Sequence, residues 1–384
     1  GQLRWSSNST VETKASSKKR PRTAIFFPGQ GVQRVGMLQP WLSTFPRTAQ
    51  PFLDELDALL PMTPSLTSII QSGSNATLTA TANSQPAIMA TSVLILRILQ
   101  QEFGLDLPGR VDFTLGHSLG EFAALVAGGY LAYADAVKMV RARGEAMAAC
   151  SVEARKVAGD VGMVALVCED EGRMKDLIRD ITEFVTAGQG KSDSAEDLAP
   201  VQQVLIANVN SRNQIVLSGT IERIRALLTN LRQFGGHDPR AVRLKSDSPF
   251  HSPMMAPAEK SVRKLLSEKS CVTGGDMVAF PGDLIAISNI TAQPFRSKAD
   301  VEDLLARQCV ETVQWWESVR YLDREEKVRR WIGVGPGKVG RNLVGKEVGM
   351  KGAGKGGGVW GITSPKEAEE CMRGLEQTEE AGEE

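Results

Sequence analysis

Gly116-His117-Ser118-Leu119-Gly120-Glu121 decides the fold of this chain, because it joins two segments of different character. The residues before it, Val111-Asp112-Phe113-Thr114-Leu115, form an apolar run that favours a buried strand, and residues 122–127 favour a helix. Gly-x-Ser-x-Gly between a strand and a helix is the signature of a nucleophile elbow, a strained turn whose glycines tolerate closely approaching backbones. We therefore expect an α/β fold in which Ser118 projects from this turn, beside a helix N-terminus that favours negative charge.

A serine hydroxyl becomes a good nucleophile when a base takes its proton, and histidine is the usual base near neutral pH. The chain has three histidines. His117 precedes the serine, so at an elbow its side chain should point elsewhere. His237 lies in Gly235-Gly236-His237-Asp238-Pro239, which is typical of a surface turn. His251 lies in a proline-bracketed loop with apolar neighbours, and we predict that it is the base; the alternative is a solvated or merely packed imidazole.

The composition limits the classes of protein that fit. At roughly 150 residues per domain, 384 residues suggest two or three units, or one large domain with an insertion. Lysine plus arginine and aspartate plus glutamate number 45 each, and this balance argues against a nucleic-acid binder. No apolar run is long enough to span a bilayer, so we expect no membrane contact. The five cysteines form no Cys-x-x-Cys pair and no cluster with metal-ligand spacing, so we expect free thiols, a reducing compartment and no metal.

Both ends of the chain differ from its middle. Residues 1–22 are serine-rich and hold six lysines and arginines against one acid, Glu12. This composition is typical of a mitochondrial transit segment or its remnant, and equally of a disordered extension, and we exclude it from the fold. Residues 365–384 form an acidic tail, whose last part, 376–384, we expect to be disordered. We also expect flexible stretches at 188–200 and 351–358, which are rich in small and polar residues.

The order of the expected elements divides the chain into two subdomains. Residues 151–248 alternate as strand, helix, strand, strand, helix and strand, which is the ferredoxin-like split unit. The flanking segments contain the elbow and further strands and helices. We therefore predict a large α/β-hydrolase-like subdomain with a parallel sheet, made of residues 23–150 and 249–364, and an inserted small ferredoxin-like subdomain, made of residues 151–248.

Several short motifs occur together in one order. They are Phe27-Pro28-Gly29-Gln30-Gly31, the elbow, Arg143-Gly144-Glu145-Ala146-Met147, Ala207-Asn208-Val209-Asn210, Gln214-Ile215-Val216-Leu217-Ser218-Gly219, Phe250-His251-Ser252 and Val334-Gly335-Pro336-Gly337-Lys338. Gly-x-Ser-x-Gly alone marks many hydrolases, but the complete series is specific. From about residue 23 to about residue 363 the chain resembles the malonyl-CoA:acyl-carrier-protein transacylases.

The resemblance implies a role for each residue of the site. Ser118 would be the nucleophile that accepts the acyl group, and His251 the general base and acid. Gln30 and the backbone N–H of Leu119 would form the oxyanion hole. Arg143 would bind the free carboxylate of the malonyl group, which suits the planar fork of a guanidinium. The remaining positions would orient His251 through a backbone carbonyl (Gln308) or line the substrate site (Asn208, Asn210 and Phe250).

The same resemblance implies an acyl-carrier-protein S-malonyltransferase. It would move a malonyl group from malonyl-CoA to the phosphopantetheine thiol of acyl carrier protein, by a ping-pong route through malonyl-serine, and so supply fatty-acid synthesis. We expect a monomer that needs no cofactor. Dissociated fatty-acid synthesis of this kind occurs in bacteria and mitochondria. With the basic N-terminus, the mitochondrial matrix is the expected location, and the cytoplasm is the alternative.

Two other classes of function share parts of this pattern. A serine esterase or thioesterase of the α/β-hydrolase type would use Ser118 and the elbow, but it would give Arg143 and Gln30 no role. Its histidine would also follow an acid late in the chain, whereas no histidine follows His251. A non-catalytic scaffold that binds a carrier protein is the second alternative, and the intact set of Ser118, His251 and Arg143 argues against it.

Overall fold

A parallel sheet of five strands forms the centre of the large subdomain. The computed structural model describes residues 20–187, 204–246, 248–350 and 357–380. In the described part of the chain the sheet has the order β7-β2-β1-β8-β9. Its strands are β1 (Thr23–Phe27), β2 (Phe113–Gly116), β7 (Ile285–Ala286), β8 (Arg330–Val334) and β9 (Gly358–Ile362). All four pairings are parallel, so the carboxyl ends of the strands meet at one edge.

Helices cover both faces of this sheet, because successive side chains of a strand point to opposite sides. Ala24 and Phe26 of β1 pack with helices α13 and α14, and Ile25 and Phe27 pack in the larger core with α5, α7 and α15. The helices before the insertion are α1 (Gln39–Thr44), α2 (Pro46–Leu59), α3 (Leu66–Ser72), α4 (Asn75–Thr79), α5 (Thr81–Gln101), α6 (Leu107–Arg110), α7 (Gly120–Ala127) and α8 (Tyr133–Ala158). Those after it are η3 (Pro253–Met255), α11 (Ala256–Leu266), α12 (Lys298–Arg307), α13 (Trp315–Arg324), α14 (Val339–Val348) and α15 (Pro365–Glu380).

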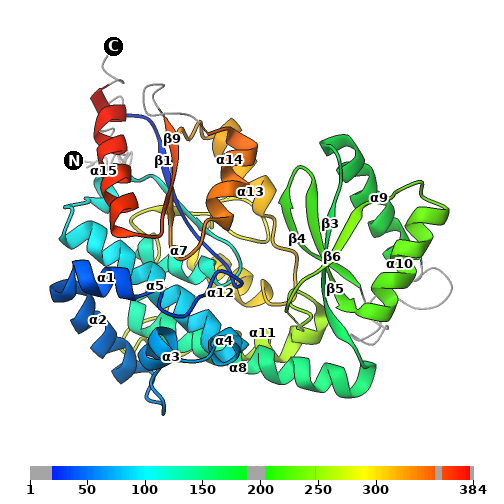
Figure 1. Ribbon diagram of the computed structural model, residues 1–384, viewed down its shortest axis with the longest axis horizontal. Coiled ribbons are helices and arrows are strands. Elements are labelled where there is room, and N and C mark those ends of the chain that lie inside the picture. Colours follow the sequence, from blue (N-terminus) through cyan, green and yellow to red (C-terminus); the bar gives the residue numbers. More distant parts are fainter. Residues whose placement is uncertain (1–19, 188–203, 247, 351–356, 381–384) are drawn as a thin grey trace, which may run out of the picture.

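The small subdomain has the predicted ferredoxin-like order of elements. It contains β3 (Val161–Val167), α9 (Glu171–Ala187), β4 (Leu205–Ser211), β5 (Gln214–Thr220), α10 (Ile221–Gln233) and β6 (Arg240–Arg243). The strands form an antiparallel sheet in the order β4-β5-β3-β6. One face packs on α9 and α10, which lie on the outer side in Figure 1, and the other face turns towards the large subdomain.

The boundaries of the units differ from the prediction in three places. Helix α8 continues through the expected boundary at residue 150 and ends at Ala158. Residues 20–22 belong to the fold, because the Arg20 guanidinium pairs with Asp112 and the Arg22 carbonyl accepts from two backbone N–H groups that precede and begin β8. The expected acidic tail is a helix as far as residue 380, with Ala368, Cys371 and Leu375 buried against the large subdomain.

The predicted flexible stretches 188–200 and 351–358 lie outside the described residues, apart from Gly357 and Gly358. Gly358, which we included in the second stretch, instead begins β9. Within the described residues, no helix combines the length and the apolar character needed to cross a membrane.

Candidate active site

The strand-to-helix turn after β2 holds Ser118 in a conformation that few side chains adopt. The φ angle of Ser118 is 53°, in the left-handed region. Two glycines make the turn possible, because a Cβ on Gly116 would lie 1.9 Å from the Gly120 carbonyl oxygen, and a Cβ on Gly120 would lie 2.5 Å from that of Phe27. The elbow therefore packs directly against the end of β1, as its glycine spacing predicts.

His251 lies beside Ser118, and both nitrogens of its ring have a partner. Its Nε2 is 2.8 Å from Ser118 Oγ, and its Nδ1 is 2.7 Å from the backbone oxygen of Gln308. Because a carbonyl only accepts, Nδ1 carries the proton and Nε2 is free to accept the proton of the serine. Burial and the neighbouring Arg143 and His117 lower the pKa of His251 to about 3, which keeps the imidazole neutral at neutral pH.

Arg143 brings a buried positive charge to the same place. Its side chain is on α8 and the residue is only 1% exposed. Nη1 donates to Gln85 Oε1 at 2.7 Å, and Nη2 donates to Gln308 Oε1 at 2.8 Å and to Ser118 Oγ at 3.3 Å. Among the described residues no carboxylate forms an ion pair with Arg143, and its Nε has no hydrogen-bond partner. A buried guanidinium with neutral neighbours strongly favours an anionic ligand.

The other predicted site residues of the large subdomain lie around Ser118, His251 and Arg143. Leu119 precedes α7 at its N-terminus, and its backbone N–H makes no hydrogen bond to a described residue. Gln30 lies on the loop after β1, and its amide is 3.5 Å from the Thr81 hydroxyl. That loop contacts the elbow, since a Cβ on Gly29 would lie 2.8 Å from the His117 carbonyl oxygen. Phe250 is buried in the large core next to His251.

The small subdomain contributes β4 to the site. Asn210 Oδ1 is 2.9 Å from His117 Nε2, so this asparagine contacts the elbow directly. Asn208 is buried on the same strand and bridges to Val313. Burial lowers the pKa of His117, so this ring is also neutral at neutral pH. His237 lies elsewhere in the small subdomain, with its Nε2 2.7 Å from Asp180 Oδ2.

Three residues of the site had no predicted role. Gln85 accepts from Arg143, Asn289 accepts from the backbone N–H of Ser118, and Glu121 contacts both Asn289 and Gln308. Glu121 was visible in the elbow motif, and Gln85 precedes a helical proline, but Asn289 follows β7 without any motif. Burial raises the pKa of Glu121 to about 8, although its hydrogen bonds and Arg143 act against that rise.

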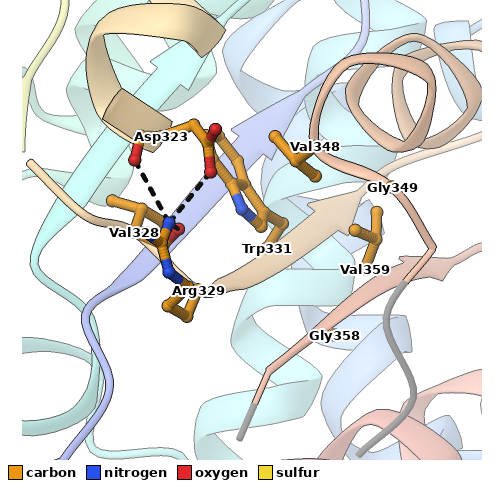
Figure 2. Close-up of a pocket in the computed structure, with 8 residues that line it drawn as sticks. All are labelled: Asp323, Val328, Arg329, Trp331, Val348, Gly349, Gly358 and Val359. Carbon is orange, nitrogen blue, oxygen red and sulfur yellow. Dashed lines mark hydrogen bonds and ion pairs between the residues drawn. The ribbon is translucent and has the colours of Figure 1, made fainter. Parts of the chain in front are cut away.

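A pocket elsewhere on the molecule is unrelated to this site. Figure 2 shows it beside the amino ends of β8 and β9, where Arg329 donates to Asp323 and Trp331 forms part of the wall. Ser118 follows the carboxyl end of β2, so the two places lie at opposite edges of a parallel sheet. Among the described residues, no three histidine, cysteine or acidic side chains gather as metal ligands would.

The fold, with Ser118, His251 and Arg143 brought together at the elbow, fits the class of acyltransferases. Residues 25–191 match the family model described as "Acyl transferase domain". The "Malonyl CoA-acyl carrier protein transacylase" of Bacillus subtilis (strain 168) is 35% identical over 325 residues, which are 85% of this chain and 90% of that protein. The chain belongs to the family of malonyl-CoA:acyl-carrier-protein transacylases.

Solved structures agree with this assignment. The acyl-carrier-protein S-malonyltransferase from Bartonella henselae has a TM-score of 0.74 and 29% identity, over 92% of this chain and 99% of that one. A malonyl-transacylase solved in complex with its type II polyketide acyl-carrier protein has a TM-score of 0.72 and 25% identity, over 92% and 99% of the two chains. The fold is the predicted one, a large α/β subdomain with a parallel sheet plus a small subdomain.

Proposed function

We propose that this protein transfers the malonyl group of malonyl-CoA to the phosphopantetheine thiol of acyl carrier protein, through a malonyl ester of Ser118. The single observation that best supports this substrate is the Arg143 guanidinium, buried without a carboxylate partner among the described residues and 3.3 Å from Ser118 Oγ. An acyl group with a free carboxylate would supply the missing negative charge at the position of the nucleophile.

In the first half of the reaction, His251 Nε2 takes the proton of Ser118 as Oγ attacks the thioester carbon. The Oγ–C bond forms, and the negative charge that develops on the carbonyl oxygen is held by the backbone N–H of Leu119 and by the Gln30 loop. The C–S bond then breaks, and His251 returns the proton to the thiolate of CoA. The Gln308 carbonyl holds the imidazole in the tautomer that this step needs.

The second half reverses these steps with a different thiol. His251 takes the proton of the carrier-protein thiol, the sulfur attacks the ester carbon, and Ser118 leaves with the proton returned to Oγ. Nucleophile, base and carboxylate clamp are all side chains of this chain, and the proposed transfer uses no cofactor. The relatives' names and the structure of a transacylase with its carrier protein support acyl carrier protein as the partner.

Mass spectrometry of the intact protein after brief mixing with malonyl-CoA, without acceptor, tests this function. We expect one malonyl adduct, mapped to Ser118, which holo acyl carrier protein removes. Release of CoA with free malonate and no adduct would instead indicate a thioesterase. Neither adduct nor CoA release would indicate a binding role or a different acyl donor.

We also propose that the protein acts as a monomer in the mitochondrial matrix, with the cytoplasm as the alternative location. The basic, serine-rich composition of residues 1–22 supports the matrix. Fusion of residues 1–22 to a reporter protein tests the location, since a reporter that stays in the cytoplasm would favour the alternative. Sedimentation of the purified protein tests the oligomeric state.

A further inference from the structure

The reaction described above gives no task to Glu121, although this carboxyl group lies one helical turn beyond the nucleophile. Glu121 is 1% exposed, and each of its two oxygens accepts one hydrogen bond. Oε1 accepts from the backbone N–H of Asn289 at 2.8 Å, and Oε2 accepts from Gln308 Nε2 at 2.8 Å. Both neighbours are donors, and an amide in place of the carboxyl group could accept from only one of them.

Asn289 links Glu121 to the strained turn. Its Oδ1 accepts from the backbone N–H of Ser118 at 2.8 Å, and its Nδ2 donates to the Gly116 carbonyl at 2.6 Å. The Asn289 side chain therefore bonds to the elbow at two points, Gly116 and Ser118. It is buried next to β2, because β7, which precedes it, is the neighbouring strand. These two bonds stabilise the left-handed conformation of Ser118.

Gln308 links Glu121 to the rest of the site. Its Nε2 donates to Glu121 and to the Ser118 carbonyl at 3.0 Å, while its Oε1 accepts from Arg143 Nη2. A reversed amide would place two donors, Nε2 and the guanidinium, against each other. Glu121 accepts the N–H of Gln308 and thereby favours the orientation in which the amide oxygen faces Arg143.

We propose that Glu121 and Asn289 are positioning residues of acyl transfer, which fix the Ser118 turn and, through Gln308, the guanidinium of Arg143. Asn289 acts on the nucleophile, whereas Glu121 acts on both the nucleophile and the carboxylate clamp. The expected changes in malonylation rest on the proposed function. The expected effect on the position of Ser118 does not.

Two nearly isosteric substitutions separate these effects. In Glu121→Gln, one of the two facing donors meets an N–H2 group, so the Gln308 amide loses its fixed orientation. We expect the rate of Ser118 malonylation at saturating malonyl-CoA to fall about 10- to 100-fold, the range for displacing a reacting group by about an ångström. The preference for malonyl-CoA over acetyl-CoA should fall as well. In Asn289→Asp, an oxygen faces the Gly116 carbonyl, so we expect a similar loss of rate with the preference retained.

Asp135→Asn is the matched control. Asp135 is also buried near a helix start, and its two oxygens also accept from two donors, the Ser270 hydroxyl and the Cys271 N–H, but it lies two turns along α8 from Arg143. This variant should lower the melting temperature by a similar amount and keep the malonylation rate within about twofold of the wild type. A rate loss in Glu121→Gln and Asn289→Asp no larger than in Asp135→Asn would overturn the proposal. If one of the two fails to fold, the other decides.

A fluorophosphonate probe separates this inference from the proposed function. The Oγ–P bond forms, fluoride leaves and His251 takes the proton, and no carboxylate is present for Arg143. If wild-type protein reacts with the probe but takes no malonyl group, the proposed function fails, and slower labelling of both variants still supports positioning. If wild-type Ser118 reacts with neither reagent, the assignment of the nucleophile fails and the positioning roles fail with it.

Discussion

Ser118 and His251 share an unusual backbone state. Within the described residues, four non-glycine residues have a positive φ, and the proposed nucleophile and base are two of them, at 53° and 54°. Such conformations persist where surrounding contacts hold them. At Ser118 these contacts are the side chains of Asn289 and Gln308, and at His251 they are the Gln308 carbonyl and the serine itself. The reacting atoms are thus placed before a substrate arrives.

The charge of Arg143 leads to a prediction about acyl preference. Arg143→Ala should lower kcat/KM for malonyl-CoA by at least about 100-fold, because a charge-assisted, paired hydrogen bond in a buried site is lost. Acetyl-CoA has no carboxylate, so its use should change little. Initial rates with both donors give the ratio. Arg141→Ala is the control, since Arg141 lies on the same helix but donates to Glu145, Ala82 and Asn83 and not to Ser118. Equal loss with both donors would contradict the carboxylate clamp.

The pKa of His251 leads to a prediction about pH. The folded-state pKa lies near 3, below the ordinary 6.5, so the base stays unprotonated in mild acid. The kcat/KM for malonylation should therefore be nearly constant from pH 7.5 to 5.5, where an ordinary histidine would lose about tenfold. When malonyl-CoA is bound, its carboxylate offsets the positive charge of Arg143, which raises the pKa of His251. The pH below which kcat falls should therefore be higher than the pH below which kcat/KM falls. A fall of kcat/KM centred near pH 6.5 would show that burial does not lower the pKa of His251.

The same pKa shift affects stability. Between about pH 6.5 and 3 the unfolded chain binds this proton and the folded chain does not, so the free energy of unfolding falls as the pH falls.

Sequence motifs identified the residues that meet at the elbow better than the residues that hold them in place. Ser118, Arg143 and His251 stand in short segments of distinctive composition, and the structure brings them together. Asn289 and Gln85 have ordinary neighbours, and their importance comes from the contact of distant segments. A single sequence contains no local signal for such contacts, so these two residues could not be found before the fold was known.

At the scale of elements, local periodicity predicted the helices and strands of the small subdomain. Composition alone gave a wrong prediction at the C-terminal end. Helix α10 has apolar residues at helical spacing that pack on the antiparallel sheet, so its pattern and its environment agree. Residues 365–384 are rich in glutamate, and we predicted an acidic tail whose last part, 376–384, would be disordered. Their few apolar side chains nevertheless fall on one face of α15, and burial against the large subdomain decides the structure. We also missed α14 and β9, which follow glycine-rich segments.

Helix α15 should contribute measurably to stability. Leu375 is 1% exposed and belongs to the large core. Leu375→Ala should lower the free energy of unfolding by about 2–4 kcal/mol, from lost burial and the cavity left behind. Urea unfolding measures this change. Glu376→Ala, at the exposed neighbouring position, should change it by less than about 0.5 kcal/mol. If the two variants unfold alike, α15 does not pack as described. The specific activity of folded Leu375→Ala should match the wild type, because α15 contains no residue of the site.

At the scale of the molecule, the site lies where the large and small subdomains pack against each other. One face of the antiparallel sheet packs on its own helices, its other face belongs to the large core, and the carboxyl edge of the parallel sheet carries the elbow. Strand β4 closes one side of the site through Asn210 and through backbone bonds that pair Ala207 and Val209 with Val313, at 2.8 and 3.0 Å. A transferase must keep water from its acyl-serine, and the packing of β4 against the elbow is a physical means of doing so.

Loss of the bond between Asn210 and His117 should therefore increase hydrolysis. In Asn210→Ala, the buried His117 ring loses its partner and β4 loses a contact with the elbow. Loss of one such hydrogen bond changes the equilibrium between packed and separated β4 and elbow by about tenfold. We expect malonyl-enzyme to decay to free malonate about tenfold faster in the absence of carrier protein, while the rate of malonylation falls less. Arg212→Ala, at an exposed position in the following turn, is the control. Quenched-flow mass spectrometry of the malonyl-enzyme measures both rates. A higher KM for malonyl-CoA with unchanged hydrolysis would show instead that Asn210 binds substrate and does not seal the two units together.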